Sequence, residues 1–257
     1  MAPAGSKTAS PDADCGTLKV EVWRGTSAGS FQTFEVQRRD KQTVLDVVTT
    51  IQRDQDATLS YRFACRVGMC GSCAMTVNGS PRWTCRTQVS QATQGGRLRL
   101  EPLRNFTVVK DLAIDMVQFF DKWTGAKGFF EPGRPKDSVA AKDLDFAVVS
   151  PESKERQAAN AGIECIGCGI CYAACDVVHW RKDYFGPAAL NRAWTLVNDV
   201  RDGGQEERLD AVAGDGGCHA CHTHMSCTRL CPKHIAPTYS IAGLKRAVLL
   251  NSLRGRR

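Results

Sequence analysis

The fold is decided by two stretches of the sequence, CRVGMCGSCAMTVNGSPRWTC at residues 65–85 and CIGCGICYAAC at residues 165–175. The first stretch follows the pattern Cys-x4-Cys-x2-Cys-x11-Cys, which is the plant-type spacing for a [2Fe-2S] centre. The second has the Cys-x2-Cys-x2-Cys-x3-Cys spacing of bacterial ferredoxins. A third group lies between residues 218 and 231, so the three clusters hold all of the 13 cysteines except Cys15. Two unlike iron-sulfur signatures in one chain indicate a protein that carries electrons.

Two other uses of cysteine fit the pattern less well. A disulfide framework belongs to short secreted domains, whereas this chain has 257 residues and an odd number of cysteines. Structural zinc sites use two separated cysteine pairs, whereas here three cysteines recur at every third position and a fourth follows. A zinc-bearing nucleic-acid module is therefore a competing hypothesis only, and we predict no nucleic-acid partner. A colourless protein with zinc but no acid-labile sulfide would establish that module.

Length and composition favour a water-soluble protein with two domains. The 257 residues include 42% hydrophobic residues, enough for one or two modest cores. No apolar run approaches the roughly 18 residues of a membrane span. The chain begins MAPAGSKTASPDADCG, without the basic and then apolar order of a secretory signal, so we expect a reducing bacterial cytoplasm. The net charge is +7, and the basic residues near the C-terminus could face anionic lipid, an acidic partner or solvent.

Hydrophobic periodicity predicts a small α+β domain in the first part of the chain. Strands are expected at residues 18–22, 34–36, 75–77 and 97–101. Apolar residues recur at helical spacing between Val44 and Ile51, which predicts an amphipathic helix. The dipeptide Asn78-Gly79 is typical of a hairpin turn.

Later residues follow the period of helices. Leu112, Met116, Phe119 and Phe120 share one helical face, and an irregular linker is expected at 125–135. The sequence Ser150-Pro151-Glu152 predicts the N-cap and first turn of a helix that ends near Ala161. A weaker helical pattern covers 184–217 with a break at Gly203-Gly204, and a final helix follows Pro237. We expect a polar tail at 1–16, a [2Fe-2S] domain at 17–108 and a helical domain at 109–257.

Cysteine spacing also predicts the ligands of each centre. In two-cluster ferredoxins the fourth cysteine of each run binds the cluster of the other run. The third run lacks the middle cysteine of the motif and has His224 in its place, so three thiolates remain there and predict a [3Fe-4S] centre. The expected ligands are Cys65, Cys70, Cys73 and Cys85 for [2Fe-2S], Cys165, Cys168, Cys171 and Cys231 for [4Fe-4S], and Cys175, Cys221 and Cys227 for [3Fe-4S].

Two further residues are candidate ligands of the third centre. Cys218 lies three positions before Cys221, and His224 could bind iron through a ring nitrogen. The favoured interpretations are a free thiol for Cys218 and an imidazole bonded to solvent or a carbonyl for His224. Gly68 and Gly71 allow the positive φ values and the close backbone approach that wrapping a cluster requires, and Gly167 is a weaker candidate for the same role.

These residues resemble a known family, the iron-sulfur subunits of succinate dehydrogenase and fumarate reductase. The resemblance extends from Leu18 to about Ala247 and is carried by the motifs Ser60-Tyr61-Arg62, Cys65-Arg66-x-Gly68-x-Cys70-Gly71-Ser72-Cys73, Val109-Lys110-Asp111-Leu112, Cys165-Ile166-x-Cys168 and Cys227-x3-Cys231-Pro232-Lys233. It implies an α+β fold in which a β-grasp [2Fe-2S] ferredoxin domain precedes an all-α, bacterial-ferredoxin-like domain.

The resemblance also implies a function and partners. A member of this family passes single electrons from an FAD-bearing subunit, which oxidises succinate or reduces fumarate, to quinone. It does so within the tricarboxylic acid cycle and the respiratory chain. The dicarboxylate site lies on the flavoprotein, so no catalytic residue is expected here. One or more membrane-anchor subunits would hold the chain on the cytoplasmic face of the bacterial membrane.

Family motifs place two residues at the quinone. A tryptophan five residues after the crossing cysteine helps to form the quinone site, and a histidine follows the first cysteine of the third run; Trp180 and His222 occupy these positions. Their alternative roles are packing and hydrogen bonding to the backbone. The chain departs from the family at Asp176, where proline is usual, and at His179, which is often aromatic, and both residues adjoin the expected quinone pocket.

Two hypotheses keep the iron-sulfur centres but change the function. A free multi-cluster ferredoxin would have no flavoprotein partner, and co-purification from native membranes separates it from a subunit of a complex. The iron-sulfur arm of another quinone-linked dehydrogenase would act on a different substrate, and a succinate-to-dye assay identifies that case.

Overall fold

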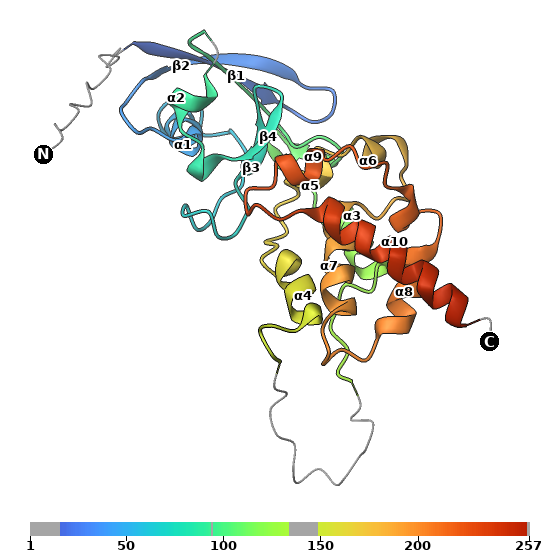
Figure 1. Cartoon of the computed structure of the whole chain (residues 1–257). Coiled ribbons are helices and arrows are strands. Elements are labelled where there is room, and N and C mark those ends of the chain that lie inside the picture. Colours follow the sequence, from blue (N-terminus) through green and yellow to red (C-terminus); the bar gives the residue numbers. More distant parts are fainter. Residues whose placement is uncertain (1–15, 94, 134–148, 256–257) are drawn as a thin grey trace, which may run out of the picture.

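The computed structural model describes residues 16–93, 95–133 and 149–255. The first part of the chain forms a mixed sheet with one long helix, and the second part is helical, so the fold is α+β. In Figure 1 the sheet lies at the upper left, helices α7, α8 and α10 lie at the lower right, and α5 and α9 lie between them. Cys15 lies outside the described residues.

Five strands of the described chain form one sheet in the order β2-β1-β5-β3-β4. Strand β1 pairs antiparallel with β2 and parallel with β5, and β5 pairs antiparallel with β3. The strands are β1 (Thr17–Arg24), β2 (Ser30–Gln37), β3 (Ala74–Val77), β4 (Ser80–Trp83) and β5 (Arg97–Glu101). The expected strands at 18–22, 34–36, 75–77 and 97–101 are confirmed, and the turn at Asn78-Gly79 connects β3 to β4.

Helix α1 (Val44–Asp54) packs its apolar stripe against the sheet. Its N-terminus has a capping box, because the Thr43 hydroxyl accepts from the Asp46 N–H while the Asp46 carboxylate accepts from the Thr43 N–H. The predicted apolar residues from Val44 to Ile51 are buried in the same core as the inward side chains of β1 and β5. This core supports the first cysteine loop, which connects α1 to β3.

A small hairpin connects the sheet to the helices. It consists of β6 (Val108–Lys110) and β7 (Ala113–Ile114), and α3 (Val117–Gly125) follows. The prediction that Leu112 and Met116 share a helical face with Phe119 was therefore wrong. Asp111 has a φ of 52° in the turn of the hairpin, and Leu112 is buried in the core of the sheet. The expected linker at 125–135 begins where α3 ends, and its residues 134 and 135 lie outside the described part.

Helices build the second part of the chain. They are α4 (Lys154–Ile163), α5 (Ile170–Ala173), α6 (Asp176–Trp180), α7 (Pro187–Val197), α8 (Gln205–Ala213), α9 (Ser226–Arg229) and α10 (Pro237–Arg254). The N-cap of α4 is Ser153 and not the predicted Ser150, because the Ser153 hydroxyl accepts from the Arg156 N–H at 3.1 Å. The break at Gly203-Gly204 and the helix after Pro237 are confirmed.

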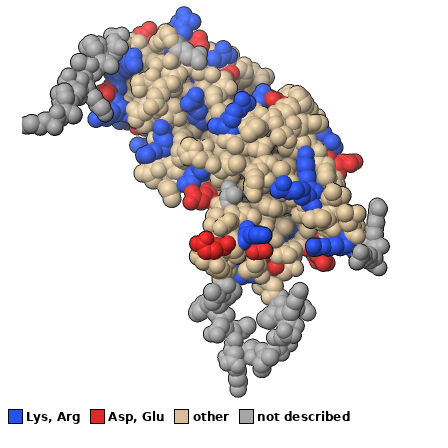
Figure 2. All heavy atoms as spheres, viewed as in Figure 1, with Lys and Arg blue, Asp and Glu red and all other residues tan. Residues whose placement is uncertain are grey.

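The helical core is centred on α7 and α10. A Cβ atom at Gly243 would lie 2.5 Å from the Trp194 ring, so only glycine lets the two helices approach this closely. Within the described residues, no helix has the length and apolar composition of a membrane span. Figure 2 shows lysine and arginine side chains dispersed over the visible face, with acidic side chains among them.

Candidate iron-sulfur sites

The first cysteine loop wraps its own sulfur atoms with backbone N–H groups. The N–H groups of Met69 and Cys70 donate to Cys65 Sγ at 3.2 and 3.3 Å, and the Cys85 N–H donates to Cys73 Sγ at 3.5 Å. Gly68 has a φ of 75°, and a Cβ there would lie 2.9 Å from a carbon of the Arg86 side chain. The predicted glycine thus fits a position that needs both a left-handed backbone and close packing.

The surroundings of this loop shift the pKa values of two of its cysteines in opposite directions. Burial opposes ionisation of Cys70, but hydrogen bonds from Ser72 and from the Cys65 N–H lower the pKa of its thiol to about 6. Burial, followed by the neighbouring Cys73, raises the pKa of Cys85 to about 12. Because iron binds thiolates, a bound cation would offset the cost of ionising the more buried cysteine.

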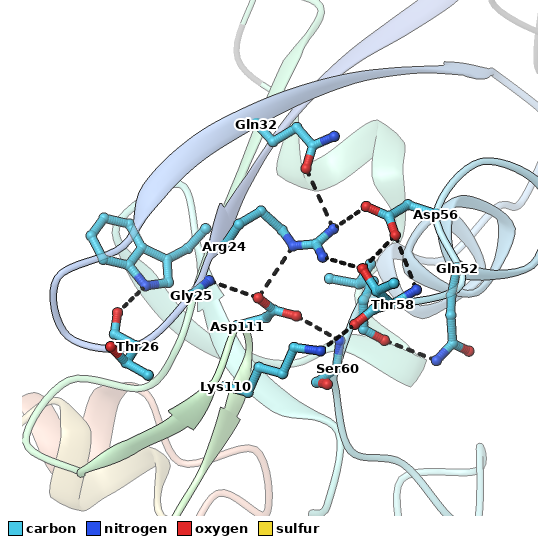
Figure 3. Close-up of polar contacts among 12 residues, drawn as sticks. Arg24, Gly25, Thr26, Gln32, Gln52, Asp56, Thr58, Ser60, Lys110 and Asp111 are labelled. Atoms are coloured by element: carbon cyan, nitrogen blue, oxygen red, sulfur yellow. Dashed lines mark hydrogen bonds and ion pairs between the residues drawn. The ribbon is translucent and has the colours of Figure 1, made fainter.

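A buried carboxylate fixes the start of the same loop. Asp111 Oδ1 accepts from Arg24 Nε at 3.2 Å and from the Gly25 N–H at 2.7 Å, while its Oδ2 accepts from the Ser60 N–H at 2.8 Å. In Figure 3 these bonds converge on Asp111 in the β6–β7 turn, and they come from the β1–β2 turn and from the segment before the cysteine loop. The side chain of Asp111 is 1% exposed. Asp111 therefore connects the sheet to the entrance of the loop.

Four cysteines meet at a second site. Cys165, Cys168 and Cys171 precede or begin α5, and Cys231 follows α9, yet all four line one cavity. Burial, before any other cause, raises the pKa of Cys168 to about 12 and also raises that of Cys165. Gly167 and Gly169, between these cysteines, have φ values of 62° and 78°, which bend the loop around the cavity.

The remaining cysteine cavity, called the third cavity after the third cysteine run, lies at the start of α6. It is lined by Cys175, Cys221 and Cys227, together with Tyr184, His222 and His224. The Thr223 N–H donates to Cys221 Sγ at 3.4 Å. The structure thus brings the last cysteine of each run beside the other run, as the ferredoxin spacing predicts for Cys231 and Cys175.

The three cysteine groups lie next to one another. Gly71 of the first loop has a φ of 71°, and a Cβ there would lie 2.5 Å from Cys168 Cβ. The first loop therefore rests directly on the second cysteine run. In turn, the pKa of the Cys171 thiol is raised well above its usual value by burial and by the sulfurs of Cys168, Cys165, Cys227 and Cys231. Cys227 lines the third cavity, so the second and third groups are also neighbours.

Residues between the sheet and the helices hold the crossing cysteine in place. The Asn105 amide donates to the carbonyl oxygens of Tyr172, Ala173 and Cys175 at 3.0, 3.3 and 3.2 Å. Asn105 has a φ of 70°, which asparagine tolerates better than most residues. Its other amide atom, Oδ1, lies 3.2 Å from His179 Nδ1. No sequence pattern marks Asn105, because a single asparagine in an irregular segment has no periodic signal.

The remaining candidate residues differ in burial. Cys218 is fully buried in the helical core and is not among the residues that line the third cavity, and its role as a free thiol stays a prediction. His224 lines the cavity, lies 3.8 Å from Asp176 Oδ2 and makes an edge contact with the Trp180 ring. Trp180 is 64% exposed. Asp176 also pairs with Arg104 at 3.1 Å, so both departures from the family motif contact the segment 104–105.

A site for a single metal ion differs from a site for an iron-sulfur cluster. Among the described residues, no group of three or more His, Cys, Asp or Glu side chains is arranged to hold one metal ion.

Comparisons with known proteins agree with this geometry. Residues 18–121 match the family model of a 2Fe-2S iron-sulfur cluster binding domain, and residues 162–235 match a 4Fe-4S dicluster domain. The fumarate reductase iron-sulfur subunit of Mycobacterium tuberculosis is 34% identical, over 89% of this chain and 90% of that protein. The mitochondrial succinate dehydrogenase (ubiquinone) iron-sulfur subunit of Dictyostelium discoideum is also 34% identical, over 86% of this chain and 77% of that protein.

A solved structure is also similar. A chain of the Mycobacterium smegmatis Sdh1 complex in the apo form aligns with a TM-score of 0.76 and 28% identity, over 90% of this chain and 95% of that chain. The sequence matches extend over both cysteine-bearing parts of the chain, and the relatives are covered along most of their length. The chain therefore belongs to the family of iron-sulfur subunits of succinate dehydrogenase and fumarate reductase.

Proposed function

We propose that this chain is the electron-transfer subunit of a membrane-bound succinate:quinone oxidoreductase. Three iron-sulfur centres, when bound, supply one-electron carriers between a flavin, which exchanges electron pairs with the dicarboxylate, and quinone. The proposed ligands are Cys65, Cys70, Cys73 and Cys85 for [2Fe-2S], Cys165, Cys168, Cys171 and Cys231 for [4Fe-4S], and Cys175, Cys221 and Cys227 for [3Fe-4S].

The observation that carries the proposal is the exchange of cysteines between the last two runs. Cys231 lines the cavity of the second run, whereas Cys175 lines the cavity of the third. The donor sets fit the proposed centres, because four thiols face one cavity and three face the other. His224 stands at the place in the third cavity where a fourth cysteine would complete the motif.

Contacts between the groups support the order of the centres. The Gly71 backbone lies against Cys168, which places the first loop beside the second site. The neighbouring sulfurs of Cys171 and Cys227 place the second site beside the third. We therefore propose that an electron entering at the first loop passes the second site before it reaches the third.

We further propose the domain organisation and the partners that this role requires. A β-grasp [2Fe-2S] domain at 17–108 would be followed by an all-α, ferredoxin-like domain at 109–257. An FAD-bearing flavoprotein would supply electrons, and one or more anchor subunits would hold the chain at the cytoplasmic face of the membrane. Exposed Trp180 and His222, which lines the third cavity, are the proposed quinone contacts.

Purification from native membranes tests the assembly. We expect the chain to co-purify with a flavoprotein and the preparation to reduce an artificial dye with succinate. A chain that never accompanies a flavoprotein would indicate a free ferredoxin, and a complex that does not oxidise succinate would indicate another dehydrogenase.

EPR spectroscopy of the isolated and reduced protein, with iron and sulfide analysis, tests the centres. We expect an oxidised [3Fe-4S] signal before reduction and signals of the other two centres after it. Zinc in place of iron and sulfide would overturn all three ligand assignments.

A further inference from the structure

The hydroxyl group of Tyr184 is buried, makes no well-formed hydrogen bond and interacts with the side chain of Cys221. Tyr184 is 1% exposed, and among the buried side-chain nitrogen and oxygen atoms of the described residues its hydroxyl oxygen is the one with no well-formed hydrogen bond. Leaving such a group unpaired costs about 1–3 kcal/mol, so a native protein rarely keeps one without a reason. A phenylalanine would fill the same space at no such cost.

The surroundings of this hydroxyl include cysteine sulfur atoms. Tyr184 lines the third cavity together with Cys175, Cys221 and Cys227. The side chain of Cys221 interacts with the hydroxyl as a hydrogen-bond partner. A phenol is protonated at neutral pH and can act as a donor toward sulfur.

The backbone around Tyr184 leaves the ring little freedom to turn away. Tyr184 belongs to the helical core, and the next residue, Phe185, donates its N–H to the Gly216 carbonyl at 2.8 Å. Gly186 follows with a φ of 87°, and a Cβ there would lie 2.7 Å from the Tyr172 ring. The packing of the segment that leads into α7 thus holds Tyr184 at the cavity wall, where its side chain meets that of Cys221.

We propose that Tyr184 tunes the reduction potential of the third centre by donating a hydrogen bond from its hydroxyl to a sulfur atom there, either Cys221 Sγ or an inorganic sulfide beside it. This inference rests on the proposed function, because it requires a cluster in the third cavity. A cluster carries more negative charge when reduced, so the bond stabilises the reduced form and raises the potential. Backbone donors such as the Thr223 N–H remain when the phenol is removed.

The substitution Tyr184→Phe in the assembled complex isolates this one bond. At an applied potential equal to the wild-type midpoint, we expect the ratio of oxidised to reduced third centre to rise about tenfold, which corresponds to a midpoint about 59 mV lower for one electron. EPR titration of the oxidised [3Fe-4S] signal measures this shift. Tyr61→Phe is the matched control, because its hydroxyl bonds Thr49 in the first domain, and the third centre should keep its wild-type midpoint.

The outcomes separate this inference from the proposed function. A wild-type complex without an oxidised [3Fe-4S] signal would refute the proposed third centre itself. A normal signal with the same midpoint in Tyr184→Phe would refute the role of Tyr184 alone. Pulsed EPR after exchange into D2O gives a second measurement on the same samples: wild type should show one exchangeable proton coupling that Tyr184→Phe lacks, and identical proton spectra would also overturn the inference.

Discussion

Replacing the buried Asp111 by asparagine should loosen the entrance to the first cysteine loop. The introduced amide has the same shape as the carboxylate but only one acceptor oxygen. If that oxygen still accepts from Arg24 and Gly25, the amide NH₂ group faces the Ser60 N–H, which loses its partner. An unpaired buried donor costs about 1–3 kcal/mol, and loss of the charge opposite Arg24 adds about 1 kcal/mol. We therefore expect Asp111→Asn to lower the free energy of unfolding by about 2–4 kcal/mol.

Denaturant unfolding of the purified holoprotein, followed by the visible absorption of the clusters, measures this change. Because the damage is local to the sheet and its loop, the [2Fe-2S] spectrum should be lost at a lower denaturant concentration than the spectra of the other two centres. Asp54→Asn is the matched control: Asp54 pairs with Arg53 at 2.6 Å, but the two side chains are 44% and 66% exposed. An exposed pair contributes about 0–1 kcal/mol, so if the two variants are destabilised equally, Asp111 does not anchor the loop.

Three further substitutions test other parts of the site. Gly71→Ala puts a methyl group 2.5 Å from Cys168 Cβ, so it should lower the free energy of unfolding by about 2–4 kcal/mol and slow reoxidation of the first centre in freeze-quench EPR. Gly79→Ala is the control: Gly79 has a φ of 76° but lies in open space, so this substitution should lower the free energy of unfolding by only about 1–2 kcal/mol. Cys218→Ala should leave the iron content unchanged while stability falls by about 1 kcal/mol, and lost iron would identify Cys218 as a ligand. His224→Cys should convert the third centre to [4Fe-4S], and persistence of the oxidised [3Fe-4S] EPR signal would contradict the alignment of this run.

Local patterns predicted the elements whose side chains face a single core. The alternation in β1 and the stripe of α1 are consequences of one buried face, and that face is what hydrophobic periodicity detects. The pattern misled at Leu112, which is apolar at a helical spacing from Met116 but is buried under the sheet after a left-handed turn at Asp111. It also misled at Ser150, because two serines precede α4 and only the bond to the Arg156 N–H selects Ser153.

The polar residues that position the centres could not be predicted in the same way. Asn105 is recognised only once the carbonyl groups at the end of α5 converge on it, and Tyr184 only once cysteines of two runs line the same cavity as its side chain. The cysteines that meet at each site were predictable as groups because iron-sulfur chemistry constrains their spacing along the chain. A hydrogen-bond donor to a cluster has no such constraint, since any segment that reaches the sulfur can provide it.

The proposed exchange of cysteines between the second and third runs also constrains how the second part of the chain folds. In the proposed ligand sets neither run completes its own centre, because Cys231 lines the cavity of the second run and Cys175 that of the third. Assembly of one centre therefore requires the helices that carry both runs to be packed together, and it brings the ligands of the other centre into place. The first loop contains its four cysteines within one segment and needs no such partner. The contact of Gly71 with Cys168 then joins a centre that can assemble locally to a pair that assembles only as a unit.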